Sequence, residues 1–148
     1  MPVAYFVRGI AYRELGQRDR ALVEAKRAIS LDPNYAGAHV LQATLLYSTG
    51  EHQEGLQLIK RAIALNPHHP NNYSFHLGQA HYLLHQYDDA VEAFNKVLAS
   101  NPAVERAHLW LAAAYAQAGM RDDAEWEIKQ VLAANPTLSM ERIRSLYA

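Results

Sequence analysis

A proline-containing phrase recurs four times along the chain and divides it into units of nearly equal length. In each copy, residues with helical spacing lead into Asn or Asp and then proline, at Pro33, Pro67, Pro102 and Pro136. Proline lacks the backbone N–H and disfavours the helical conformation of the preceding residue, so each copy marks the end of a helix. The prolines are 34, 35 and 34 residues apart. A fixed period of this size predicts a stack of repeats.

Each unit contains two segments of helical periodicity separated by a turn. In the first unit they cover residues 2–15 and 18–31, and in the second they cover 36–48 and 52–65. The turns of the first, second and fourth units contain glycine, which adopts a left-handed conformation at little cost. These glycines are Gly16, Gly50 and Gly119. The third unit has His85 there, and histidine tolerates positive φ better than most residues.

The composition excludes several classes of protein. The length of 148 residues is that of one domain, and half of the residues are hydrophobic. No uninterrupted apolar run approaches the ~18 residues of a membrane span. The absence of cysteine excludes disulfides and thiolate chemistry, and the net charge of −1 argues against nucleic acid as a partner. Residues 1–5 lack the features of a signal peptide, so we expect a cytoplasmic rather than an exported protein.

The units resemble the tetratricopeptide repeat (TPR) family. Its pattern is a large residue, Leu-Gly and Tyr in the first helix, then Ala, an aromatic residue and Pro in the second. The third unit matches at Leu77, Gly78, Ala90, Phe94 and Pro102. The other units match at Tyr5, Gly9, Tyr12, Ala21, Ala28 and Pro33, at Ala43, Leu46, Gly50, Gly55, Ala62 and Pro67, and at Leu111, Ala112, Tyr115, Gly119, Ala124 and Pro136.

The resemblance implies an all-α fold, a right-handed superhelical solenoid of four TPR helix-turn-helix repeats plus a short C-terminal capping helix. Residues 1–148 then form a single TPR domain, with repeats at approximately 2–35, 36–69, 70–104 and 105–137. Residues 138–148 favour the capping helix because Met140, Ile143 and Leu146 share one face. Pro2 enters the first helix without a cap, so we expect a segment of a longer chain whose uncapped ends self-associate.

Small residues recur where the two helices of each unit should cross. They are Gly9, Ala43, Gly78 and Ala112 in the first helices and Ala21, Gly55, Ala90 and Ala124 in the second. Small side chains allow the two backbones to approach closely. Each hairpin then leaves apolar surface that only the next hairpin can cover, so stability should depend mostly on contacts between neighbours.

Several positions depart from the family pattern. Arg8 stands where leucine is usual, and His81 stands where the family has tyrosine. The large aromatic residue is replaced in three units, by His39, Ser74 and His108. One extra residue at 68–72, between the second and third units, should change the local stacking angle.

No pattern typical of an enzyme is found in the sequence. The chain has no glycine-rich phosphate loop. Acidic pairs at residues 88–89 and 122–123 stand at the starts of second helices, where they complement the helix dipole. His81 and His85 are four residues apart but would need a third ligand to hold a metal, so we interpret them as a packed histidine and a turn histidine. We expect no catalysis, no cofactor and no metal.

The resemblance implies that the first helices line a concave groove, in which equivalent positions of successive repeats form columns. The predicted groove residues are Phe6, Ile10, Arg13, Val40, Thr44, Tyr47, Asn72, Phe75, Gln79, Tyr82, Arg106, Leu109 and Trp110. An apolar base with two tyrosines in register and several amides suits an extended or helical peptide. For the column of Phe6, Val40, Phe75 and Leu109, packing against neighbouring helices is an equally good interpretation.

The sequence therefore predicts a protein-interaction or scaffold module that binds a peptide or helix in this groove. Repeats that clamp the acidic C-terminus of heat-shock chaperones use Lys and Asn where this chain has Phe6 and Ile10, so that role is not expected. The alternative is a regulatory TPR segment of a larger bacterial signalling protein, such as an adenylate cyclase or a transcriptional regulator. Residues 75–80 and 107–114 are similar to the C-terminal arrays of bacterial class III adenylate cyclases. In either case the partner is a protein or peptide, or another segment of the parent chain.

Overall fold

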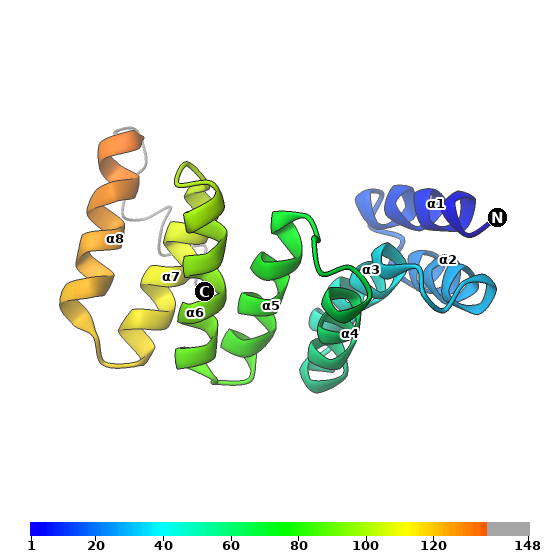
Figure 1. The fold of residues 1–148 in the computed structure, drawn as a ribbon, viewed down its shortest axis with the longest axis horizontal. Helices are drawn as coiled ribbons and strands as arrows, with labels where there is room; N and C mark the ends of the chain where they lie inside the picture. Colours follow the sequence, from blue (N-terminus) through cyan, green and yellow to red (C-terminus); the bar gives the residue numbers. More distant parts are fainter. Residues whose placement is uncertain (136–148) are drawn as a thin grey trace.

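The structure, a computed structural model, describes residues 1–135, which form four helical hairpins in a row (Figure 1). The eight helices of this part are α1 (Pro2–Glu14), α2 (Arg18–Leu31), α3 (Ala36–Tyr47), α4 (His52–Leu65), α5 (Asn71–Leu83), α6 (Tyr87–Ser100), α7 (Glu105–Gln117) and α8 (Arg121–Ala134). The predicted order of helices is confirmed, and the predicted bounds agree within a residue. The expected capping helix at 138–148 lies outside the described residues.

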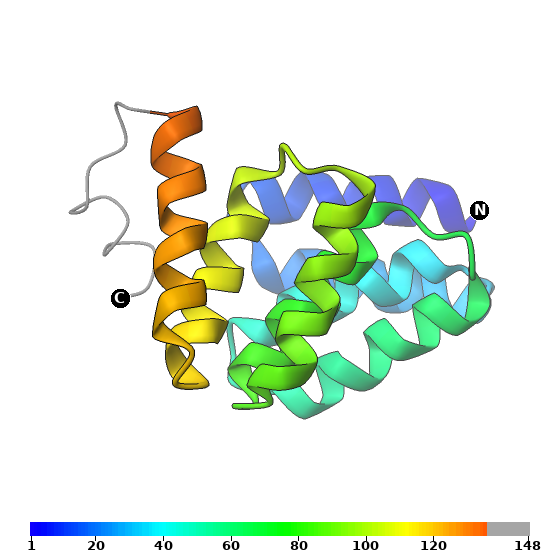
Figure 2. The same cartoon turned by 60° about the vertical axis from the view of Figure 1, so that its left-hand side comes forward.

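The hairpins pack in chain order, mainly through the second helix of one hairpin against the first helix of the next, and their first helices also touch one another. Contacts join α1 to α3, α3 to α5 and α5 to α7. Within residues 1–135, no comparable contacts join successive second helices. The first helices therefore line the inner side of the array. The row also twists, since α1 and α2 lie across the view of Figure 1 while α6 and α8 stand upright; Figure 2 shows the same array turned.

The core is divided into clusters, three of which join one hairpin to the next. One cluster contains residues of α2 and α3, a second contains residues of α3, α4 and α5, and a third contains residues of α5, α6 and α7. Among these, Phe94 and Ile59 are fully buried. Because the apolar contacts cross the joints, the stability of each hairpin depends on its neighbours.

The third hairpin shows why a small residue is needed at the crossing. The ring of Phe94 on α6 lies so close to Gly78 on α5 that a Cβ atom there would be 2.6 Å from Phe94 Cε1. The absence of that atom lets Phe94 reach Phe75 and Trp110, with ring centroids 5.7 and 6.2 Å away. The glycine thus allows an aromatic cluster to form between the third and fourth hairpins.

Two of the departures from the family pattern have a structural role at the joints. The Nε2 atoms of His39 and His108 lie 2.7 and 2.8 Å from the carbonyl oxygens of Pro33 and Pro102. Each histidine can therefore hold the preceding joint against its own helix. The Nδ1 atom of His108 also contacts the buried carboxylate of Glu127.

The joint between the second and third hairpins is the longest of the three. It spans residues 66–70, whereas the other two span 32–35 and 101–104. The ring of His69 stacks on Tyr73 at 5.5 Å between centroids. The extra residue predicted at this joint is therefore accommodated in the loop.

The turns have the predicted backbone conformation. The glycines of the first, second and fourth turns have φ between 72° and 81°. His85 takes the same left-handed conformation with φ 60°. A side chain in this region is strained because its Cβ crowds the backbone.

We expect His85→Gly to stabilise the array by about 1 kcal/mol, since glycine removes this strain. The hydrogen bond lost with the imidazole, from Nδ1 to the hydroxyl of Tyr87, is exposed and should matter less. Urea unfolding followed by circular dichroism measures the change.

The matched control is Gly119→Ala at the equivalent turn, where φ is 81° and a Cβ would meet no atom within 4 Å. It should destabilise by a similar amount through backbone strain alone. If His85→Gly and Gly119→Ala both lower the free energy of unfolding, then the contacts of the His85 imidazole stabilise the protein by more than its backbone strain destabilises it.

Candidate functional site

The inner face has a floor of buried apolar side chains. Val40 and Phe75 are each 7% exposed, Leu109 is 3% exposed, and all three belong to core clusters. Phe6 is half-buried and meets the ring of Tyr35 edge-on at 5.2 Å. For this column the packing interpretation accounts for three of the four members, so little of their surface is left for a ligand.

Above this floor, polar side chains connect the first two hairpins. Arg13 Nη1 on α1 donates to Thr44 Oγ1 on α3 at 3.4 Å. The Thr44 hydroxyl in turn donates to the carbonyl oxygen of Leu41 at 2.8 Å. Arg13 also pairs with the exposed carboxylate of Glu14 at 3.0 Å. Ile10 lies partly buried in the cluster below.

Tyr47 connects the second hairpin to the third. Its hydroxyl donates to the carbonyl oxygen of His76 at 3.2 Å. Its ring fits because residue 55 is glycine, where a Cβ would lie 2.5 Å from Tyr47 Cε1. Burial raises the pKa of Tyr47 well above the usual range of tyrosine. Tyr47 is thus mainly a packing residue between the second and third hairpins.

His76 is a central residue of the inner face that was not among the predicted site residues. Its Nδ1 lies 2.9 Å from Gln79 Oε1. Burial lowers the pKa of His76, and the positive charges of Arg13 and Arg106 lower it further. The imidazole is therefore neutral at pH 7. Its position is equivalent to that of Trp110, one repeat later, and this register was the signal that could have identified it.

Aromatic side chains form a wall on the inner face of the third and fourth hairpins. The ring of Tyr82 meets Trp110 at 5.3 Å and Tyr87 at 5.4 Å, both edge-to-face. The guanidinium of Arg106 lies over the ring of Phe75 at 4.9 Å. Asn72 is exposed at the start of α5. The pair of Tyr82 and Trp110, which we call the aromatic wall, is half-buried and so offers surface to a ligand.

The two histidines considered for a metal are engaged within their own turn. His81 is 8% exposed, and its Nδ1 lies 2.7 Å from Gln86 Oε1. His85 Nδ1 lies 2.6 Å from the hydroxyl of Tyr87. In the described part of the chain, no three His, Cys, Asp or Glu side chains are grouped so that they could hold a metal ion. None of the helices described there is long and apolar enough to cross a bilayer.

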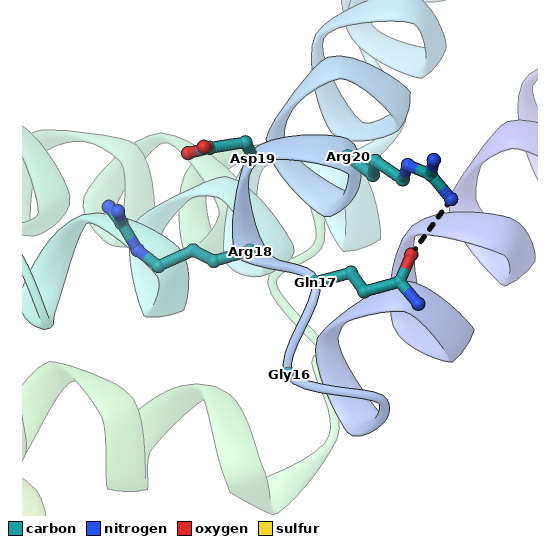
Figure 3. Close-up of a pocket in the computed structure, with 5 residues that line it drawn as sticks. All are labelled: Gly16, Gln17, Arg18, Asp19 and Arg20. Carbon is teal, nitrogen blue, oxygen red and sulfur yellow. Dashed lines mark hydrogen bonds between the residues drawn. The ribbon is translucent and has the colours of Figure 1, made fainter.

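A shallow cavity of about 530 Å³ lies away from the inner face, at the turn between α1 and α2 (Figure 3). Its arginines are engaged in packing: Arg18 donates twice to the carbonyl oxygen of Leu45, at 2.9 and 2.8 Å, and Arg20 donates to Gln17 at 3.0 Å. Figure 3 shows Arg18 and Arg20 pointing to opposite sides. The cavity has no converging polar groups, so it is not a candidate active site.

Comparison with known proteins agrees with the geometry. A model of the tetratricopeptide repeat matches residues 81–148, and a model of anaphase-promoting complex, cyclosome, subunit 3 matches residues 14–97. The chain belongs to the tetratricopeptide repeat family. The TPR repeats support a role for the protein as a protein-interaction scaffold.

Three similar proteins illustrate the extent of the likeness. Small glutamine-rich tetratricopeptide repeat-containing protein 2 of Mycosarcoma maydis is 30% identical over 45% of this chain and 19% of its own length. TPR repeat-containing protein MJ0940 of Methanocaldococcus jannaschii is 28% identical over 66% of this chain and 30% of its own length. The crystal structure of MamA superposes with a TM-score of 0.78 and 26% identity, over 89% of this chain and 77% of MamA. The chain spans less than a third of the two curated relatives.

We expect Tyr47→Phe to destabilise the array by about 1 kcal/mol at neutral pH, because the variant removes the hydrogen bond that the hydroxyl donates to the carbonyl oxygen of His76. At high pH the order is reversed, and the variant becomes the more stable of the two proteins. Since the folded-state pKa of Tyr47 is raised, the unfolded chain ionises first, and the wild type loses stability as pH rises above ~10. The difference between the two proteins should therefore shrink above pH ~10 and reverse near pH ~11.

Urea unfolding at a series of pH values measures this difference. If it is the same at neutral and alkaline pH, then Tyr47 is not buried in the way described.

Proposed function

We propose that the inner face binds an extended peptide segment of a partner protein, with an apolar or aromatic side chain of that segment against the aromatic wall. The observation that carries the proposal is the half-buried pair of Tyr82 and Trp110, whose rings meet at 5.3 Å. Such amphipathic rings provide large contact area at low entropic cost and dominate many interfaces.

Polar groups on the same two helices as the wall suit the backbone of an extended peptide. Gln79 and Asn72 lie on α5 and Gln117 lies at the end of α7, with amides that can both donate and accept. The neutral imidazole of His76 presents Nε2 in addition, because Nδ1 is bonded to Gln79. Backbone hydrogen bonds give affinity and the wall gives selectivity, as in other modes of peptide recognition.

The array then functions as a scaffold without chemistry of its own, and residues 1–148 form one binding domain. Three further possibilities stay predictions. The array could self-associate through its ends, contact another segment of a parent chain, or form the regulatory part of a larger signalling protein. Each is compatible with an occupied groove.

Trp110→Ala should lower the affinity for a groove-bound peptide by more than about tenfold, since it removes half of the aromatic wall. The probe is a peptide selected from a displayed random library on the wild-type protein, and fluorescence anisotropy measures its dissociation constant. Trp110→Phe should retain most of the affinity because it keeps a ring against Phe94 and Tyr82.

The matched control is Trp126→Ala on α8, a tryptophan that is 56% exposed and belongs to a second helix. It should leave the affinity unchanged. Thermal melting of each variant separates lost binding from lost folding. Equal affinities of the wild type and a folded Trp110→Ala variant would contradict the proposal.

A further inference from the structure

Two arginines from distant parts of the chain contact residues of the inner face, and the charge of each acts on His76. Arg13 lies on α1, Arg106 on α7 and His76 on α5 between them. The guanidinium of Arg106 lies over the ring of Phe75 at 4.9 Å, and that ring meets the imidazole of His76 edge-on at 5.8 Å. The charges of Arg13 and Arg106 both lower the pKa of His76. The inner face therefore has a positively charged region in a protein whose net charge is −1.

Contacts with groove residues hold both arginines in place. The guanidinium of Arg106 lies over the ring of Phe75 at 4.9 Å, and Arg13 donates to Thr44 at 3.4 Å. An arginine fixed against a neighbouring side chain loses less entropy when it binds a carboxylate. These positions are therefore preorganised for an anionic group.

The charges of the two arginines are only partly neutralised within the protein. Arg13 pairs with the exposed carboxylate of Glu14. No carboxylate in residues 1–135 forms an ion pair with Arg106. The described ion pairs thus leave Arg106 available, and Arg13 can exchange an exposed partner for another one.

We propose that the peptide bound in the groove carries an Asp or Glu side chain close to its apolar anchor, and that Arg106 binds this carboxylate, with the charge of Arg13 adding a longer-range attraction. The inference rests on the proposed groove function and adds the chemistry of the partner. The site differs from the positions of Phe6 and Ile10, which correspond to the lysine and asparagine of chaperone-binding repeats. The acidic residue is recognised here as an internal side chain, beside the aromatic wall.

The arrangement also explains how one peptide could satisfy several groups at once. A carboxylate at Arg106 places the adjoining peptide backbone beside His76, whose Nε2 can accept an N–H. The neighbouring anchor then reaches Trp110, which follows Arg106 by about one turn of α7. The charge, the acceptor and the aromatic wall thus form one continuous surface.

The test uses a defined panel of short synthetic peptides with a central tryptophan or leucine anchor and Glu, Gln or Lys at each position beside it. Fluorescence anisotropy at low salt measures affinities for the full chain. The Glu peptides should bind on the order of tenfold more tightly than the Gln peptides, because charge-assisted hydrogen bonds are stronger than neutral ones. The Lys peptides should bind most weakly, and the preference should diminish as salt is added.

Arg106→Gln should abolish the preference for Glu while leaving the affinity for the Gln peptides unchanged. The matched control is Arg61→Gln, which removes the same charge from an exposed position of α4, a second helix. It should preserve the preference. Glu14→Gln should increase the preference, since it releases Arg13 from its internal ion pair.

The outcomes separate the two proposals. If the peptides bind with no preference among Glu, Gln and Lys, or if Arg106→Gln leaves the preference intact, this inference is wrong and the groove function stands. If no panel peptide binds and Trp110→Ala has no effect on any selected peptide, the groove function itself fails and the inference fails with it.

Discussion

The close packing between consecutive helices is the constraint on which the rest of the structure depends. Gly78 admits the ring of Phe94, and Gly55 admits the ring of Tyr47, each at a distance that a Cβ atom would forbid. These contacts fix the rotation of each helix about its axis, because interdigitated side chains in a dense core have few alternatives. The rotation decides which residues of the first helices face inward. A change of one small residue would therefore alter both stability and the composition of the inner face.

The helices and their order could be predicted from the sequence. Which of their side chains are buried and which face the groove could not. Helices and turns follow from local features, such as the prolines at the joints and the left-handed turn that His85 adopts with φ 60°. The burial of Val40 and Tyr47 depends on how one hairpin stacks on the next, which periodicity does not specify. The repeat register places His76 beside the groove, in the same position as Trp110, but it does not reveal the influence of Arg13 and Arg106, which come from two other hairpins.

The likeness to MamA and to other TPR proteins concerns the scaffold and does not define the ligand. A solenoid positions columns of side chains, and the residue at each place in a column determines which partner can bind. In this chain the inner face changes along its length, from the hydrogen-bonded pair of Arg13 and Thr44 to the aromatic wall of Tyr82 and Trp110. An extended peptide would therefore bind in one orientation, because the two ends of the surface differ in chemistry.

Each joint between hairpins is bridged on the inner face by a side chain that also belongs to the candidate binding surface. Arg13 connects the first two hairpins, Tyr47 connects the second to the third, and Arg106 connects the third to the fourth. Since successive first helices touch one another along this face, these contacts help to set the curvature of the array. A ligand that binds Arg13 or Arg106 would therefore bind side chains that also hold neighbouring hairpins together. If a partner binds the groove as proposed, binding and curvature would be coupled through the same few side chains, and the partner would favour one shape of the solenoid.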